Sequence, residues 1–339
     1  MVAELASVRF STSEFGIAEP VLGIHPPRVV ALACSTRPIQ IYDYFHRLEQ
    51  LISLQHEYPS EAFYIISDND KFARNQSPGE RREAIVNAAS ACLALGLDEK
   101  KAVLYRQSDL PQALQLLWSM PCSVVNGADQ EVANEPVHSE VNYLPVDQTA
   151  LFAANGLVIR GTIMVGEAEQ LSGFQYARDL ARMFNHRYGQ QVLTCPGARL
   201  VGRQNAPNHF ASLSDNLLSP FASRKELEEG LAQSFAYARR TATAESSRAT
   251  LLHLHRSVCS DIDRQMAFEK QLLSGREYSR LTKLLAANIE SYFSTAAARY
   301  AKLRDNFDYV WDVLREGAYL ASLQADRTLI AVRQAIGVV

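Results

Sequence analysis

Short apolar runs alternate with helical patterns along the first two thirds of the chain. Residues 28–33 form an apolar run that ends in a polar loop, which predicts a buried strand, and residues 62–67 repeat the pattern. Residues 42–56 carry apolar side chains near helical spacing and residues 80–95 are rich in alanine, so both predict helices. Further apolar runs predict strands at 102–105, 156–159 and 191–194.

Strands that alternate with helices indicate a parallel sheet, because each helix carries the chain back over one face of that sheet. We therefore predict an α/β fold with a Rossmann-like parallel sheet. Ligands of such sheets bind beyond the carboxyl ends of the strands, so the functional site is expected at that edge.

The pattern changes near Ser223. From there to the terminus the chain is helical in composition, with few Pro or Gly residues and no strand alternation. We predict three parts: a polar leader at 1–27, the Rossmann-like domain at 28–222 and a helical domain at 223–339.

The charge of the chain excludes a global attraction to nucleic acid. It has 34 basic and 37 acidic residues, a net charge of -3, so any RNA contact needs a local patch and no DNA partner is expected. The candidate patches are Arg81-Arg82, Lys100-Lys101 and the segment 239–248. Each of them also fits an ordinary solvated surface.

The five cysteines stand singly, without the close pairs that zinc sites and disulfide frameworks use, so no metal is expected. The first residues lack a basic stretch followed by an apolar one, and no apolar run reaches the roughly 18 to 20 residues that span a bilayer. We therefore expect a cytoplasmic protein without a membrane partner.

Three ordered blocks resemble tryptophanyl-tRNA synthetases. Residues 325–337 resemble the final helix of that family, residues 105–111 its strand and QS loop, and residues 178–185 the helix after its substrate pocket. The resemblance runs from about Val30 to Val339. It implies a class I catalytic domain, a helical anticodon-binding domain, a homodimer and tRNA or aminoacyl-tRNA as a partner.

The first class I signature is altered. Its small residues let ATP phosphates approach the start of the first helix, where Gln40, Ile41, Tyr42 and Asp43 stand in this chain. Tyrosine replaces the small glycine, and Asp43 adds negative charge where an anion should lie. The same two residues also suit an aromatic packing position and an acid in the first turn of a helix. Both interpretations predict a poor ATP site.

The second signature supplies lysines that stabilise charge on the phosphates. His209, Phe210, Ala211, Ser212 and Leu213 stand at its place, and both lysines are absent. Loss of one such charge commonly costs roughly 100-fold to 1000-fold in rate. We therefore expect no ATP cofactor, and a surface loop is the plain interpretation of this segment.

The amino-acid pocket is altered less. Asn155 stands where the family's indole-reading aspartate is expected, and Glu169-Gln170 stand where its Asp-Gln pair is expected. Asn155 keeps an acceptor oxygen but loses the charge that would strengthen its bond. Gln107 is kept from the QS loop and Asp68 directly follows a predicted strand, so both are candidate ligand contacts. For Gln170 a helix surface, and for Asp68 a turn, are equally ordinary roles.

Ser35 is the one candidate nucleophile, because it lies in the loop at the edge of the first predicted strand. Cyclodipeptide synthases, which are class I relatives without ATP signatures, resemble this arrangement in using a serine there on aminoacyl-tRNA, although this is an analogy at the level of the fold. Three hypotheses remain: a specialised enzyme that handles an amino acid or aminoacyl-tRNA, a non-catalytic protein that binds tryptophan or tRNA, and an active tryptophan–tRNA ligase with divergent signatures. The altered signatures favour the first.

Overall fold

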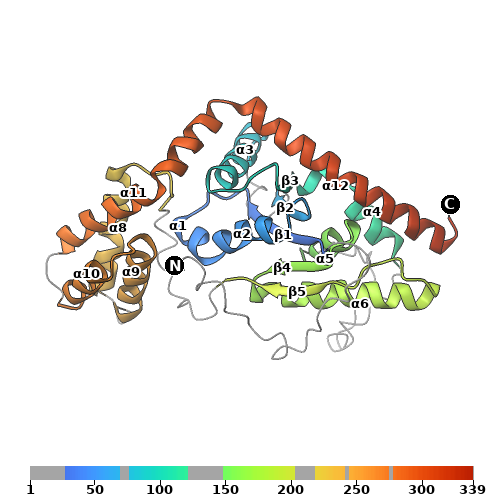
Figure 1. Ribbon diagram of the computed structural model, residues 1–339, viewed down its shortest axis with the longest axis horizontal. Coiled ribbons are helices and arrows are strands. Elements are labelled where there is room, and N and C mark those ends of the chain that lie inside the picture. The colour runs from blue at the N-terminus through green and yellow to red at the C-terminus, as the bar shows by residue number, and fades with distance from the viewer. Residues whose placement is uncertain are drawn as a thin grey trace, which may run out of the picture.

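The computed structural model describes residues 27–68, 76–120, 148–202, 218–240, 244–274 and 278–338. At its centre lies a parallel sheet with the strand order β3-β2-β1-β4-β5 (Figure 1). Its strands are β1 (Val29–Ser35), β2 (Ala62–Ser67), β3 (Ala102–Arg106), β4 (Ile163–Gly166) and β5 (Gly197–Leu200). The chain adds strands on one side of β1 and then on the other, so the topological switch point lies between β1 and β4.

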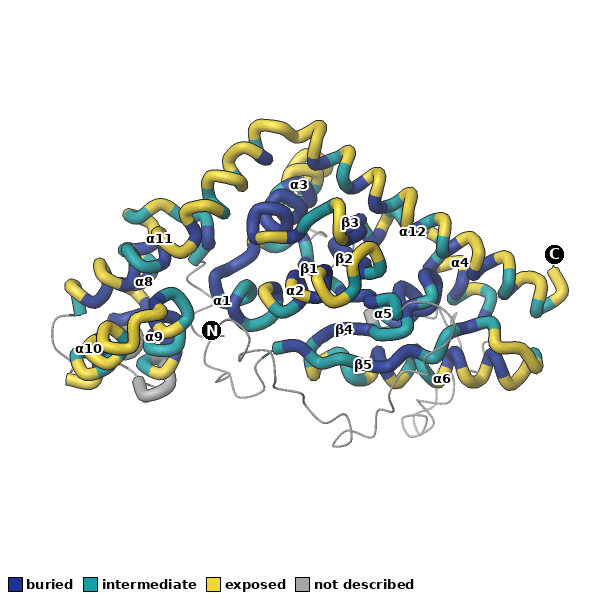
Figure 2. The backbone as a smooth tube through the Cα atoms, in the orientation of Figure 1, coloured by how far each residue is buried: buried dark blue, intermediate teal, exposed yellow. Residues whose placement is uncertain are grey.

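Alternate strand residues point to two separate cores. Val29 and Ala31 face one core together with Tyr64, whereas Val30 and Phe63 face the other. Because both faces are covered, the strands are apolar on both sides and appear as the dark centre of Figure 2. This is the Rossmann-like arrangement that the sequence predicts.

Helices cover both faces of the sheet. The face that bears Val29 packs against a segment that runs from α1 (Ile41–Asp43) through a π-helical turn at Tyr44–Leu48 into α2 (Glu49–Glu57), and against α3 (Pro78–Ala94). The opposite face packs against α4 (Gln112–Ser119), α5 (Gln148–Val158) and α6 (Leu171–Tyr188). Short 3-10 turns at Gln107–Asp109 and Ala168–Gln170 follow β3 and β4.

The C-terminal part is helical, as predicted. Helices α8 (Arg224–Arg240), α9 (Ala244–Val258), α10 (Ile262–Ser274) and the first part of α11 (Tyr278–Arg304) gather at the left of Figure 1, while α12 (Phe307–Ile336) returns along the sheet. Gly317 permits this return, because a Cβ there would lie 2.0 Å from the carbonyl oxygen of Leu104 on β3. The domain boundaries stay predictions.

Two predicted strands are wrong. Residues 156–158 belong to α5, where Ala153, Ala154 and Leu157 are buried at helical spacing, and residues 191–194 form an irregular segment. The side chain of Asn185 binds that segment, since it accepts hydrogen bonds from the Val192 and Leu193 amides and donates one to the Leu193 carbonyl. The strands lie a few residues later in each case, at β4 and β5.

Within the described ranges, no helix combines the length and apolarity needed to cross a membrane. The predicted leader, apart from residue 27, and the segment 209–213 that stands at the second class I signature lie outside the described residues. The same holds for the side chains of Arg239 and Arg240 in the third basic patch. In the first patch, Arg81 donates a hydrogen bond to the carbonyl of Asp68.

Candidate amino-acid site

A cavity of about 140 Å³ opens at the carboxyl ends of the central strands, between the sheet and helices α5 and α6. Its walls are mostly apolar, from Val30, Leu32, Ile65, Met164 and Phe152. Ser67, Gln107, Thr149, Asn155, Glu169, Gln170, Ser172 and Gly173 complete the lining. Four of the five predicted ligand contacts therefore meet in one place, beside the switch point where ligands of this fold class bind.

A glycine gives this cavity its aromatic wall. Gly173 in α6 lies so close to Phe152 that a Cβ at this position would stand 2.6 Å from the ring. Phe152 also meets Phe174 edge to face, with the ring centroids 5.2 Å apart. Phe152 was not predicted, because the strand predicted at 156–159 concealed the helix α5 to which Phe152 belongs.

Asn155 is the most informative side chain of the site. It lies in α5, is 2% exposed, and its Oδ1 atom is buried without a hydrogen-bond partner. A buried acceptor of this kind costs about 1 to 3 kcal/mol, so it is normally satisfied. The arrangement therefore suits a ligand that brings an N–H or O–H donor into an apolar slot.

Two glutamines are held in place at the border of the cavity. The hydroxyl of Ser67 donates to Gln107 Oε1 at 3.2 Å, and the amide N–H of Glu167 donates to Gln170 Oε1 at 3.0 Å. Both bonds engage the oxygen, so the NH₂ group is the end that can meet an acceptor such as a carboxylate. Glu169 is exposed at the rim.

Asp68 and Ser35 do not line the cavity. The carboxylate of Asp68 is buried and accepts hydrogen bonds from the amide and the hydroxyl of Ser108, so it holds the turn that presents Gln107. Ser35 Oγ accepts a hydrogen bond from the Arg37 amide at 3.2 Å, which makes it part of a local turn. Asp68 thus acts on the site through Gln107, and Ser35 lies outside the amino-acid cavity.

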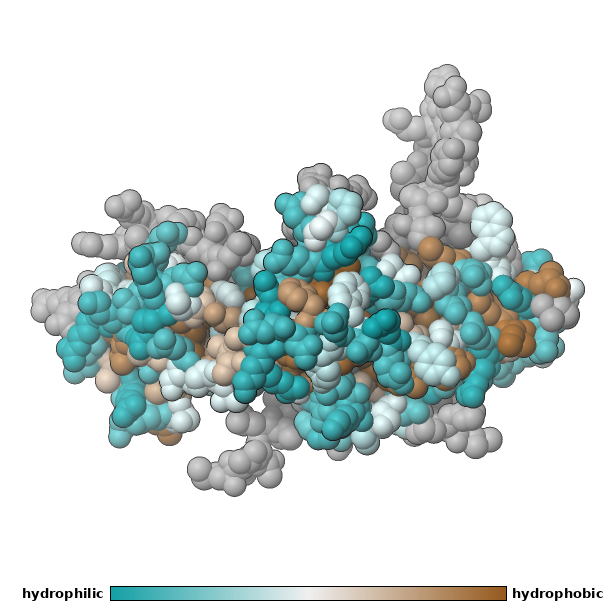
Figure 3. Space-filling view, turned by 90° about the horizontal axis from the view of Figure 1, so that it is seen from above, coloured by the Kyte–Doolittle hydropathy of each residue, from teal (hydrophilic) through white to brown (hydrophobic). Residues whose placement is uncertain are grey.

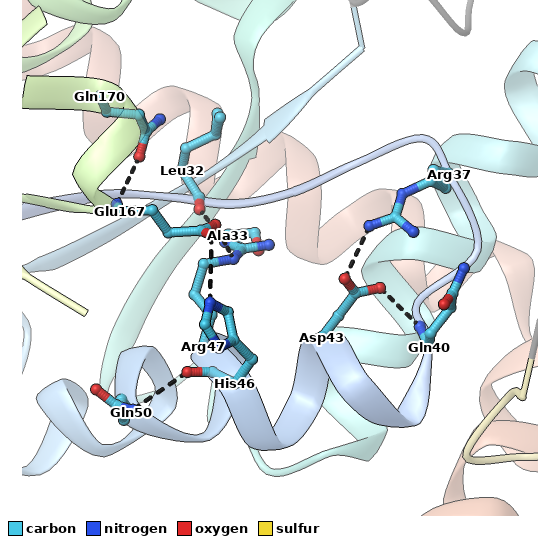
Figure 4. A network of polar contacts seen from close by, with 10 residues as sticks. All are labelled: Leu32, Ala33, Arg37, Gln40, Asp43, His46, Arg47, Gln50, Glu167 and Gln170. Carbon is cyan, nitrogen blue, oxygen red and sulfur yellow. Dashed lines mark hydrogen bonds and ion pairs between the residues drawn. The ribbon is translucent and has the colours of Figure 1, made fainter. Parts of the chain in front are cut away.

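The start of the first helix is occupied by the chain itself (Figure 4). The amide of Gln40 donates to the carboxylate of Asp43 at 2.9 Å, and that carboxylate also pairs with Arg37 at 2.8 Å. The next amide, of Ile41, donates to the carbonyl of Leu218 at 2.9 Å. These are the amides that a phosphate would use at a helix start, so as they stand they do not fit a nucleotide phosphate.

Several carboxylates gather beside this helix start. Burial raises the pKa of the Tyr42 hydroxyl to about 12, and three nearby carboxylates add to the shift. They belong to Glu167, Asp43 and Glu169. The ring of Tyr42 stacks on that of His46, with the centroids 4.8 Å apart.

An ion pair that the sequence did not reveal joins the two sides of the switch point. The β1–β2 register shifts between Leu32 and Cys34, and the Nη1 of Arg47 donates to the carbonyls of Leu32 and Ala33 there, each at 2.8 Å. Its Nε lies 2.9 Å from the carboxylate of Glu167, which follows β4 (Figure 4). Arg47 therefore satisfies carbonyls at the strand irregularity and ties β1 to β4.

Glu167 is held in its charged form. Burial alone would raise the pKa of this carboxyl, but the hydrogen bond with His46 and the charges of Arg47, His46 and Arg37 outweigh burial and lower the pKa. Among the described residues, no group of three His, Cys, Asp or Glu side chains could hold a metal ion.

Comparison with known proteins identifies the relatives of the chain. It is 27% identical over 288 residues to the tryptophan–tRNA ligase of Rhodopirellula baltica. This match covers 81% of this chain and 88% of that protein. It is 24% identical to the tryptophan–tRNA ligase of Fusobacterium nucleatum over 89% of this chain and 95% of that protein. No protein-family model matches the chain.

Solved structures give the same result for the fold. Tryptophanyl-tRNA synthetase from Campylobacter jejuni, complexed with ADP and tryptophan, matches with a TM-score of 0.71 at 21% identity, over 91% of this chain and 99% of that one. The fold is thus the Rossmann-like class I catalytic fold with C-terminal helices. The chain has tryptophan–tRNA ligases as sequence relatives over most of its length and shares the fold of tryptophanyl-tRNA synthetases. It is therefore a member of the tryptophanyl-tRNA synthetase family.

Proposed function

We propose that the cavity beside α5 binds tryptophan or a closely similar aromatic amino acid. The observation that carries this proposal is the buried, unpartnered Oδ1 of Asn155, which offers an acceptor to one N–H group in an otherwise apolar slot. An indole ring has that pattern, a flat apolar body with a single N–H donor. Phe152 supplies an aromatic wall for such a ring.

The polar rim suits the other end of an amino acid. The amide groups of Gln107 and Gln170 present donors that can meet a carboxylate, and the carboxylate of Glu169 can meet an ammonium group. The rim is therefore complementary to a zwitterion, whereas the interior is complementary to the side chain.

Tryptophan–tRNA ligation is the reaction that the comparisons favour, because the relatives from Rhodopirellula baltica and Fusobacterium nucleatum are tryptophan–tRNA ligases. This candidate implies tRNA as partner and a cytoplasmic protein. For ligation, the Asp43 carboxylate would have to leave the helix start so that ATP phosphates could reach the amides of Gln40 and Ile41.

A second candidate is favoured by that same helix start. If Asp43 stays in place, the chain binds the amino acid without activating it, and serves either in an aminoacyl-tRNA-dependent transfer or as a non-catalytic sensor of tryptophan or tRNA. The supporting observation is that the Gln40 and Ile41 amides already have partners within the chain.

The experiment is a calorimetric titration with tryptophan and with ATP, joined to a pyrophosphate-exchange assay in the presence of tryptophan. Tryptophan binding supports the proposal, and exchange then decides for ligation while its absence decides for the second candidate. Failure of tryptophan and of other aromatic amino acids to bind would refute the proposal.

We further propose a homodimer through the face formed by α4 and α12. Large apolar side chains are exposed there, including Trp118 at 92% and Tyr319 at 58%. Figure 3 shows brown side chains among teal ones in the right-hand part of the molecule, where these helices lie. Exposed apolar patches on one face are typical of a surface that another chain covers.

A further inference from the structure

A cluster of three arginines lies at the amino edge of the sheet, opposite the edge at which the amino-acid cavity opens. Arg28 directly precedes β1, Arg160 lies between α5 and β4, and Arg327 belongs to α12. None of the three lines the amino-acid cavity. A ligand of this arginine cluster would therefore be independent of the function proposed for that cavity.

One face of α12 brings the cluster together. The Nη1 of Arg28 donates to Gln324 Oε1 at 3.4 Å, and the Nε of Arg160 donates to the hydroxyl oxygen of Thr328 at 3.3 Å. Gln324 and Thr328 lie about one helical turn apart, and Arg327 belongs to the same turn. The three guanidiniums are thus gathered around one turn of α12.

The positive charge of the cluster is only partly balanced. Arg28 pairs with the carboxylate of Glu61 at 2.7 Å. Within the described part of the chain, no carboxylate lies at ion-pair distance from Arg160 or Arg327. The positions three and four residues from Arg327 in α12, where a helical ion pair would form, also carry no acid. Two positive charges of the cluster therefore lack a counter-charge among the described residues.

Arg160 is held in the cluster at a cost in energy. Burial lowers the pKa of its guanidinium, and the charges of Arg28 and Arg327 lower this pKa further. Because arginine stays charged at neutral pH, the three side chains repel one another. The backbone of Arg160 is also left-handed, with φ at 56°, a conformation that residues with a Cβ rarely adopt. Strain of this kind is typical of a binding site, where a ligand supplies the missing charge.

The surroundings of the cluster favour a compact anion. A phosphate monoester carries a charge of about −1.5 to −2 and three acceptor oxygens, which complements two guanidiniums. Carboxylates stand on both sides, because Glu61 pairs with Arg28 and Asp326, which precedes Arg327, accepts a hydrogen bond from Gln112. A long nucleic-acid backbone would meet these carboxylates, whereas a small anion fits between them.

We propose that Arg160 and Arg327 bind a phosphate dianion, either inorganic phosphate or the phosphate group of a small molecule. The hydroxyl of Thr328 orients Arg160, because it engages the Nε and leaves both Nη groups for the oxygens of the ligand. Arg28 holds the strand edge against α12 through Gln324 and adds positive charge behind the site.

The test is a calorimetric titration of the full chain with sodium phosphate at constant ionic strength. Inorganic phosphate should bind with a Kd of about 1 mM or lower, because two guanidiniums donate charged hydrogen bonds to it. Dimethyl phosphate, a phosphodiester with one negative charge, should bind at least roughly 10-fold more weakly. Tighter binding of glycerol 3-phosphate than of inorganic phosphate assigns the site to a phosphorylated small molecule, and equal or weaker binding assigns it to inorganic phosphate.

A pair of variants on α12 locates the site. Arg327→Gln should weaken phosphate binding roughly 10- to 150-fold, because it removes a charged donor, and should leave tryptophan binding unchanged. Arg333→Gln is the matched control, since it removes the same charge from the same helix, but Arg333 donates to Gln115 outside the cluster. This control should change the affinity for phosphate by less than about 2-fold.

A variant of Arg160 separates binding from a structural role. Glycine adopts the left-handed backbone freely, and Arg160→Gly also removes the repulsion from Arg28 and Arg327. The melting temperature of Arg160→Gly without phosphate should therefore equal or exceed that of wild type. Its affinity for phosphate should fall by the same roughly 10- to 150-fold.

Absence of phosphate binding would overturn the proposal, and so would phosphate binding that survives both Arg327→Gln and Arg160→Gly. An equal loss of affinity in Arg333→Gln would show a general effect of charge and also overturn it. Dimethyl phosphate that binds as tightly as inorganic phosphate would indicate a nucleic-acid backbone instead. Loss of tryptophan binding alone would affect only the function proposed for the amino-acid cavity.

Discussion

Replacing Asn155 by leucine should weaken tryptophan binding without destabilising the ligand-free protein. The Oδ1 of Asn155 has no partner in the folded chain, so the substitution breaks no hydrogen bond through that atom and removes a buried, unsatisfied acceptor. Leucine has nearly the same shape and suits the 2% exposed position. We expect the free energy of unfolding to stay within about 1 kcal/mol of wild type or to rise.

The same substitution leaves the ligand N–H without an acceptor in an apolar slot. This should cost about 1 to 3 kcal/mol of binding free energy, which is roughly 5- to 150-fold in Kd. Calorimetric titration with tryptophan measures the loss of affinity, and urea unfolding without ligand measures the change in the free energy of unfolding.

Asn185 provides the matched control. It is a second buried asparagine, but its side chain makes four hydrogen bonds at 2.7 to 3.3 Å, to the Val192 amide, to the amide and the carbonyl of Leu193, and to the side chain of Gln191. Asn185→Leu should therefore cost about 4 kcal/mol of stability, at about 1 kcal/mol for each lost bond. An Asn155→Leu protein that is destabilised as much, or that keeps full affinity for tryptophan, would refute the reasoning.

Three further predictions concern the framework. Glu167→Gln should cost about 1 kcal/mol of stability near pH 7, against less than about 0.5 kcal/mol for the more exposed Glu57→Gln. Because contacts lower the pKa of Glu167 in the folded protein, its carboxylate stabilises the fold fully above the pKa of the unfolded chain. This stabilisation should be lost as the pH falls through the lower pKa of the folded protein. A difference in urea unfolding between Glu167→Gln and wild type that does not change with pH would contradict this. Gly317→Ala should cost about 3 kcal/mol or more in thermal unfolding, since the new methyl group meets the backbone of β3, whereas Gly79→Ala, which meets open space, should be neutral or stabilising. Trp118→Glu should convert a dimer into a monomer in analytical ultracentrifugation, and an unchanged mass would exclude the α4–α12 face.

The sequence predicted the sheet and the edge at which the cavity opens, because strands buried on both faces leave long apolar runs such as 62–67. The strands at 163–166 and 197–200 were missed, since each is only four residues long and lies beside a longer apolar or polar run. Helix α5 contains enough apolar residues to resemble a strand over 156–159, and only its packing against helices α4 and α6 settles the difference.

Part of the lining of this cavity was predicted. The resemblance supplied Asn155, Gln107, Glu169 and Gln170, which do meet around one cavity. It did not predict Arg47. This guanidinium binds the carbonyls at a register shift in β1, and no residue pattern in the sequence predicts that shift.

The central claim is that Asn155 accepts the N–H of an indole ring, and one comparison tests it directly. Wild-type protein is titrated with tryptophan and with its benzothienyl analogue, in which sulfur replaces the indole N–H. Tryptophan should bind roughly 5- to 150-fold more tightly, because the analogue leaves the asparagine oxygen unpartnered. Equal affinity for the two ligands would contradict it.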